Sequence, residues 1–138
     1  MNQKQLIQNI YYADDDQDDV LLFKDVFVEL GHPINLTIAE NGIVLLEKLL
    51  ASRQHPDVIF MDLNMPLKNG FQCLKEIKTH TSLQAIPVVI LSTSSAMDNI
   101  EKSYQLGAFQ YIQKPMRFSL LKTEIEKCLV KVIGRHQN

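Results

Sequence analysis

The chain has 138 residues, of which 46% are hydrophobic and 22% charged, values typical of a single globular domain. Its formal net charge of −2 provides no basic surface of the kind that binds nucleic acid or an anionic membrane, so neither is expected as a partner. The two cysteines, Cys73 and Cys128, are too few for a disulfide framework. No segment resembles a signal peptide, and no apolar run approaches the about 18 residues of a membrane span, so we expect a cytoplasmic protein.

Short apolar segments recur along the chain and predict five β-strands. They occupy residues 10–13, 34–39, 58–61, 88–91 and 109–112. Segments 58–61 and 88–91 are apolar throughout, as expected for central parallel strands buried on both faces. Segments 34–39 and 109–112 alternate between apolar and polar residues, which is typical of strands at the edges of a sheet.

Apolar residues at helical spacing follow each of these strands. They predict helices around residues 20–30, 45–50, 71–77, 97–106 and 121–129. Gly31 and Gly107 follow the first and fourth helices as stop signals, and Asp18 or Asp19 is expected to cap the first. Five strand–helix pairs predict an α/β fold, a doubly wound three-layer sandwich around one parallel sheet of strand order 2-1-3-4-5.

Polar residues come directly after four of the predicted strands. Aspartates occupy positions 14–16 after the first strand, Asp62 follows the third, Ser92 follows the fourth, and Lys114 comes shortly after the fifth. Because the carboxyl ends of parallel strands meet at one edge of the sheet, where ligands bind in such folds, we expect these side chains to form one site. Carboxylates in one cleft repel one another unless a cation joins them, and oxygen ligands suit Mg²⁺.

The same residue types favour phosphoryl transfer, in which positioning and charge neutralisation dominate. An aspartate can be the nucleophile and form an aspartyl phosphate. The Lys114 ammonium can pair with a phosphate or a carboxylate, and the Ser92 hydroxyl can donate to a phosphoryl oxygen. Each residue alone has an ordinary explanation as a helix cap, a turn residue or a surface lysine, so the hypothesis depends on their joint positions.

At these positions the chain resembles a response-regulator receiver domain. The resemblance covers residues 8–131 and depends on segments 10–16, 61–70, 87–92 and 111–115. The run Ser92-Thr93-Ser94 is also similar to the stand-alone regulators that accompany bacterial phytochromes. The resemblance implies one receiver domain over residues 8–131, a short C-terminal tail over 132–138, and no output domain.

The resemblance assigns the phosphoacceptor and the metal ligands. Asp62 would accept a phosphoryl group from a sensor histidine kinase or a phosphotransfer protein. Asp15, Asp62 and the backbone carbonyl of Asn64 would ligate Mg²⁺ directly, and Asp14 would act through a metal-bound water. Asp16 would then be the spare carboxylate of the acidic run.

The resemblance also implies how the phosphorylated state is read. Ser92 and Lys114 would contact the phosphoryl group, and the Lys114–Pro115 peptide bond would be cis. Tyr111 would change its rotamer with the state of Ser92. The protein would be a phosphoacceptor switch and not an enzyme acting on other molecules. A downstream protein, or a second copy of the chain in a homodimer, would read the surface formed by the fourth helix, fifth strand and fifth helix.

Tyr111 has an alternative interpretation as a static aromatic residue on an edge strand. Two other protein classes also share parts of this sequence pattern. A Mg²⁺-dependent phosphatase of the haloacid-dehalogenase type would have a second aspartate two positions after the nucleophile, where this chain has Asn64. A flavin-binding protein would need a loop rich in serine, threonine and glycine after the first strand. The aspartates of segment 14–18 would repel a flavin phosphate.

Overall fold

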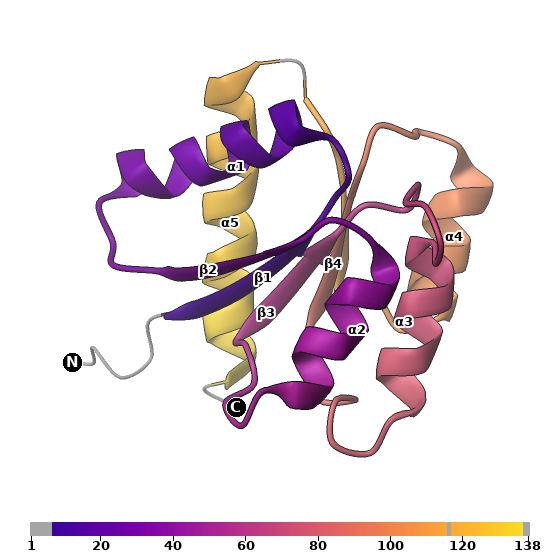
Figure 1. Cartoon of the computed structure of the whole chain (residues 1–138). Coiled ribbons are helices and arrows are strands. Elements are labelled where there is room, and N and C mark those ends of the chain that lie inside the picture. Colours follow the sequence, from indigo (N-terminus) through magenta and orange to yellow (C-terminus); the bar gives the residue numbers. More distant parts are fainter. Residues whose placement is uncertain (1–6, 116, 137–138) are drawn as a thin grey trace.

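A computed structural model of the chain describes residues 7–115 and 117–136, in which five strands alternate with five helices (Figure 1). The strands are β1 (Asn9–Ala13), β2 (Asn35–Ala39), β3 (Val58–Met61), β4 (Val88–Ser92) and β5 (Gln110–Gln113). The helices are α1 (Gln17–Leu30), α2 (Gly42–Ala51), α3 (Gly70–Thr79), α4 (Met97–Gln105) and α5 (Phe118–His136). In this part of the chain, no helix is both long enough and apolar enough to span a bilayer.

All neighbouring strands pair in parallel, in the order β2-β1-β3-β4-β5. Figure 1 shows α1 and α5 on one face of the sheet and α2, α3 and α4 on the other. The apolar core is accordingly divided into two clusters, one on each face of the sheet. The fold class and the strand order predicted from the sequence are confirmed.

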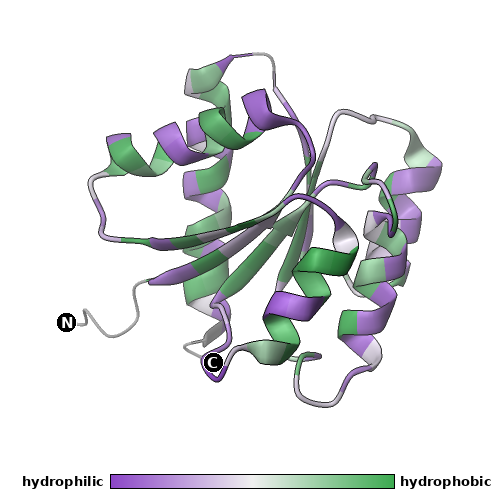
Figure 2. Ribbon diagram, viewed as in Figure 1, coloured by the Kyte–Doolittle hydropathy of each residue, from purple (hydrophilic) through white to green (hydrophobic). Residues whose placement is uncertain are grey.

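The burial of each strand follows from its place in the sheet. Every residue of β3 and β4 is buried, whereas most of β2 and β5 is half-buried or exposed. In β1, Ile10 and Tyr12 pack toward α1 and α5, and Tyr11 and Ala13 pack toward α2 and α3, as the two-residue period of a strand requires. Figure 2 shows the apolar residues concentrated in the central strands and in stripes along the helices.

The helix ends differ from the prediction in two places. Asp16, and not Asp18 or Asp19, is the N-cap of α1, because its extended backbone lets its side chain accept hydrogen bonds from the two following aspartate N–H groups, 2.9 and 3.2 Å away. Gly31 ends α1 in the left-handed conformation, with φ 73°, as expected. Helix α5 continues through residues 132–136, which the sequence had assigned to a tail, and residues 137–138 lie outside the described part.

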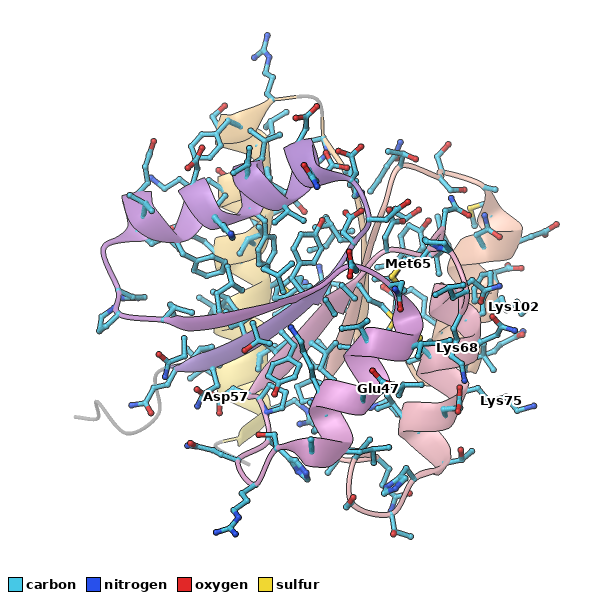
Figure 3. All side chains as sticks on the ribbon, viewed as in Figure 1. Glu47, Asp57, Met65, Lys68, Lys75 and Lys102 are labelled. Carbon is cyan, nitrogen blue, oxygen red and sulfur yellow. The ribbon has the colours of Figure 1, made fainter. Side chains whose placement is uncertain are left out.

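The loop between β3 and α3 folds tightly back over the end of β3. The Gly70 N–H donates to the Leu63 carbonyl at 2.9 Å, and a Cβ atom at Gly70 would lie 2.5 Å from the Asp62 carbonyl oxygen. Any side chain at position 70 would therefore displace the backbone that positions Asp62. Met65 and Lys68 of this loop lie beside the start of α2 (Figure 3).

The N-cap of α1 provides a test of the fold. We expect Asp16→Ala to lower the free energy of unfolding by about 1 kcal/mol, because two N–H groups at the helix start lose their acceptor. Asp18→Ala removes a carboxylate from the same turn without removing a cap and should cost about 0.5 kcal/mol or less. Urea denaturation of both variants measures the difference. Equal losses would contradict the assignment of Asp16 as the cap.

Candidate functional site

Backbone hydrogen bonds continue past the strand ends and bring the predicted site residues to one edge of the sheet. The Asp62 N–H donates to the Ala13 carbonyl at 3.0 Å, and the Lys114 N–H donates to the Ser92 carbonyl at 2.7 Å. Asp14 is attached in the same way to the last residue of β2. The side chains that follow β1, β3 and β5 therefore meet at the carboxyl edge, as the sequence predicted.

Lys114 lies among three carboxylates. Its Nζ is 2.7 Å from an oxygen of Asp19, 2.8 Å from one of Asp14 and 2.9 Å from one of Asp62. The lysine side chain is only 9% exposed. An ammonium group has three N–H donors, so the three carboxylates account for all of them.

Asp14 is held by more partners than any other carboxylate of the site. Its side chain is 0% exposed, and the oxygen that contacts Lys114 also accepts a hydrogen bond from the Tyr12 hydroxyl. The other oxygen accepts from the Asp16 N–H at 2.9 Å. A carboxylate this deeply buried needs such donors, because an unpaired charge in the interior is costly. Tyr12 is itself fully buried and stacks on Phe23 at a centroid distance of 4.2 Å.

Asp62 is less enclosed than Asp14. Its side chain is 11% exposed, and its second oxygen accepts a weak hydrogen bond from the Asn64 N–H at 3.3 Å. Burial raises the pKa of Asp62 above its usual value, although the bond to Lys114 acts in the opposite direction.

The same environment fixes the charges of the neighbouring groups. Burial alone would lower the pKa of Lys114, but its bonds to the three carboxylates outweigh burial and raise the pKa above its usual value. Burial and the nearby Asp14 charge raise the pKa of Tyr12, which keeps its hydroxyl protonated as a donor. At neutral pH the cluster therefore contains a charged lysine and a neutral tyrosine.

The predicted metal ligands lie at this edge of the sheet but do not form a preformed coordination site. Asp15 and Asn64 are exposed, and the Asp15 carboxylate makes no hydrogen bond within residues 7–115 and 117–136. In that part of the chain, no three acidic, histidine or cysteine side chains converge as a ready-made metal cage. Among the described residues both Asp15 oxygens lack a hydrogen-bond donor, and Asp62 has spare acceptor capacity. This all-oxygen donor set fits a hard divalent cation that retains several waters. A cavity of about 430 Å³ opens beside Asp14 and Asp15.

Ser92 lies at the end of β4 and is joined to Tyr111 through one intermediate residue. The buried Ser92 hydroxyl oxygen accepts from the Ser94 N–H at 3.3 Å. The Ser94 carbonyl accepts from the Tyr111 hydroxyl at 2.7 Å, and the Ser94 hydroxyl oxygen accepts from the Asn99 side chain at 2.9 Å. A continuous set of hydrogen bonds therefore connects the site with β5 and with the first turn of α4.

The structure corrects one expectation and adds two residues to the site. All peptide bonds of the described residues are trans, so the expected cis bond between Lys114 and Pro115 is wrong. Tyr12 was missed, although it stands two positions before Asp14 and therefore on the same face of the strand. Asp19 was interpreted as a helix cap, and nothing in the local sequence indicated its contact with a lysine 95 positions away.

Residues 10–126 match the family described as the response regulator receiver domain. Because this match covers most of the chain, the protein belongs to that family. Receiver domains act as phosphoacceptor switches in two-component signalling and interact with histidine kinases or phosphotransfer proteins.

Three relatives illustrate the similarity. The probable methanogenesis regulatory protein FilR2 of Methanothrix harundinacea is 30% identical over 122 residues, which are 86% of this chain and 79% of that protein. Response regulator Rcp1 of Synechocystis is 32% identical over 110 residues, 76% of this chain and 75% of that protein. Its Mn²⁺-bound structure superimposes with a TM-score of 0.74, at 28% identity over 92% of this chain and 90% of that one.

The phosphorylated cyanobacterial phytochrome response regulator RcpA has a TM-score of 0.82 at 31% identity, over 88% of this chain and 91% of that chain. Several other curated relatives are much longer. The chain spans 44% of a probable transcriptional regulator of Pyropia yezoensis and 24% of the Escherichia coli DNA-binding regulator NtrC. The similarity to those proteins therefore concerns one part of them.

Proposed function

We propose that this protein is a stand-alone response regulator that accepts a phosphoryl group on Asp62, from a sensor histidine kinase or a phosphotransfer protein, with Mg²⁺ bound beside it. The observation that supports this most strongly is the contact of Asp62 with a buried, charged lysine at the carboxyl edge of a receiver domain sheet. A stand-alone role is supported by the likeness over most of their length to Rcp1 and RcpA.

Asp62 is the best placed of the site carboxylates to act as the nucleophile. Asp14 is fully buried and already bonded to Tyr12, Lys114 and a backbone N–H, so it cannot approach a phosphodonor. Asp15 is exposed, and within residues 7–115 and 117–136 it forms no ion pair with a lysine. An oxygen of Asp62 would attack phosphorus, the bond from phosphorus to the donor nitrogen would break, and Lys114 would neutralise part of the negative charge.

The metal would be held by Asp15, Asp62 and the backbone carbonyl of Asn64, with Asp14 acting through a bound water. When bound, Mg²⁺ supplies positive charge that offsets the repulsion between the carboxylates and the incoming phosphoryl group. The Mn²⁺-bound structure of Rcp1 supports a divalent cation in a chain of this kind. The remaining acceptor capacity of Asp15 and Asp62 is consistent with it.

A Mg²⁺-dependent phosphatase acting on small molecules is the less favoured alternative. Such an enzyme would need a second carboxylate at position 64, where Asn64 is exposed and contributes only its N–H to Asp62. The likeness to RcpA, named as a phytochrome response regulator, makes a phytochrome-type kinase the first phosphodonor protein to test.

The acceptor assignment predicts one phosphorylation site. With Mg²⁺ and a small phosphodonor such as acetyl phosphate, the intact mass should increase by one acid-labile phosphoryl group. Asp62→Asn should abolish the increase, because an amide is not a nucleophile of this kind. Asp18→Asn, which removes an exposed carboxylate from the same edge, should label like the unmodified protein. Equal labelling of Asp62→Asn and the unmodified protein would refute the assignment.

Phosphorylation of Asp62 would change the hydrogen bonds of Tyr111 and α4 through Ser92 and Ser94. Ser92 ends β4, which pairs with the strand that Asp62 follows. A shift of its hydroxyl toward a phosphoryl group would break or lengthen its bond to the Ser94 N–H. Ser94 holds both the Tyr111 hydroxyl and the Asn99 side chain, so a shift of this residue affects β5 and α4 together. Apolar side chains exposed on this side, Met97, Tyr104 and Leu120, suit a surface read by a downstream protein or by a second copy.

This route predicts where the structure responds to a phosphate mimic. Binding of beryllofluoride with Mg²⁺ should shift the backbone NMR resonances of Tyr111 and of residues 97–106, in addition to those around Asp62. Asn99→Ala should weaken the response in residues 97–106 while Tyr111 still responds, because only the bond from Ser94 to α4 is removed. Shifts confined to the Asp62 pocket would show that the signal leaves by another face.

A further inference from the structure

Asp19 differs from the other two carboxylates that contact Lys114. Asp14 and Asp62 are both expected at the metal, whereas Asp19 belongs to the first turn of α1 and to no expected ligand set. Its distance to the lysine Nζ, 2.7 Å, is similar to the 2.8 and 2.9 Å of the other two contacts. Its side chain is 29% exposed, compared with 0% and 11% for Asp14 and Asp62, so it approaches the lysine from the solvent side.

The neighbouring Asp18 shows that this contact is not a general property of the helix start. Both residues follow the Asp16 cap, and both N–H groups donate to it. Both add negative charge near the amino end of the helix, where it is favourable. Of these two residues, only Asp19 contacts Lys114. Within residues 7–115 and 117–136 the exposed Asp18 side chain makes no ion pair.

We propose that Asp19 is a positioning residue that draws the Lys114 ammonium away from the metal ligands. A cation bound at Asp14, Asp15 and Asp62 competes with Lys114 for the same carboxylate charge and also repels the ammonium. Of the three carboxylates that contact Lys114, Asp19 is the one outside the expected set of metal ligands. With Asp19 in place, the contact of the lysine with Asp14 or Asp62 can weaken when a cation binds, while the contact with Asp19 keeps the ammonium near the acceptor.

Loss of Asp19 then has a defined consequence. The lysine would direct its charge entirely to Asp14 and Asp62, so a cation would bind less tightly. Once the cation is bound, the lysine would be held less firmly at the acceptor oxygen. The inference rests on the proposed function only for this second effect, since cation binding requires no phosphorylation.

The surroundings leave room for a conservative replacement. A small cavity of about 20 Å³ lies between Tyr12, Asp19, Lys114 and Pro115. The partly exposed Asp19 side chain borders it. A glutamate at position 19 can therefore place its extra methylene there or toward solvent and still contact the lysine.

The first experiment is calorimetric titration of the unphosphorylated protein with MgCl₂. Asp19→Asn should weaken Mg²⁺ binding about two- to fivefold more than Asp18→Asn does, a factor that corresponds to one partly exposed ion pair. Asp18→Asn removes the same charge from the same turn and so measures the long-range effect alone. Asp19→Glu should restore most of the affinity. Equal affinities of Asp19→Asn and Asp18→Asn, or absence of Mg²⁺ binding by the unmodified protein, would overturn the proposal.

The second experiment follows labelling by acetyl phosphate at saturating Mg²⁺. Asp19→Asn should be labelled about two- to fivefold more slowly than Asp18→Asn, because its lysine is held less firmly. Equal rates would refute this part of the proposal. If the unmodified protein is not labelled at all, the proposed function fails, whereas the Mg²⁺ titrations still decide the role of Asp19.

Discussion

The contact of one buried lysine with three carboxylates is the interaction on which this site depends. Asp14 and Asp19 lie on either side of the start of α1, whereas Asp62 follows β3, and the three carboxylates repel one another. The ammonium of Lys114 lies within 2.9 Å of all three and allows them to be held together. The arrangement still carries excess negative charge, which explains why a divalent cation is expected next to it.

The backbone of β4 and β5 determines where that lysine lies. The Ser92 carbonyl accepts the Lys114 N–H, and the Ser92 side chain accepts the Ser94 N–H. One residue at the end of β4 therefore positions the lysine through its main chain and reaches Tyr111 through its side chain and Ser94. A group added to Asp62 would act on the charge balance and on this hydrogen-bonded connection at once. We regard this shared position of Ser92 as the physical basis of the proposed switch.

The sequence predicted the sheet and the main site residues because both follow from short-range patterns. Continuous apolar runs identified β3 and β4 as central strands, and the known geometry of parallel sheets then placed Asp14, Asp62, Ser92 and Lys114 at one edge. None of these inferences required knowledge of a side-chain conformation.

The remaining features depend on where side chains point. The N-cap of α1 could not be assigned among consecutive aspartates, since each can cap a helix and only the turn after β1 selects Asp16. The sequence pattern marks Tyr12 as an ordinary strand residue, and only the structure shows that its hydroxyl donates a hydrogen bond to Asp14. Asp19 contacts Lys114 across 95 positions of sequence, and no periodic pattern records such a contact.

Stability measurements on Lys114→Met test the account most directly. Breaking a buried ion pair from one side should lower the free energy of unfolding by about 3 kcal/mol. Lys122→Met, which removes the exposed pair with Glu29, should cost about 1 kcal/mol or less. Adding Asp62→Asn to Lys114→Met should recover part of the loss, because one of the uncompensated carboxylates is then neutral. Equal losses for the two lysine variants, or no recovery in the double variant, would contradict the central role of Lys114.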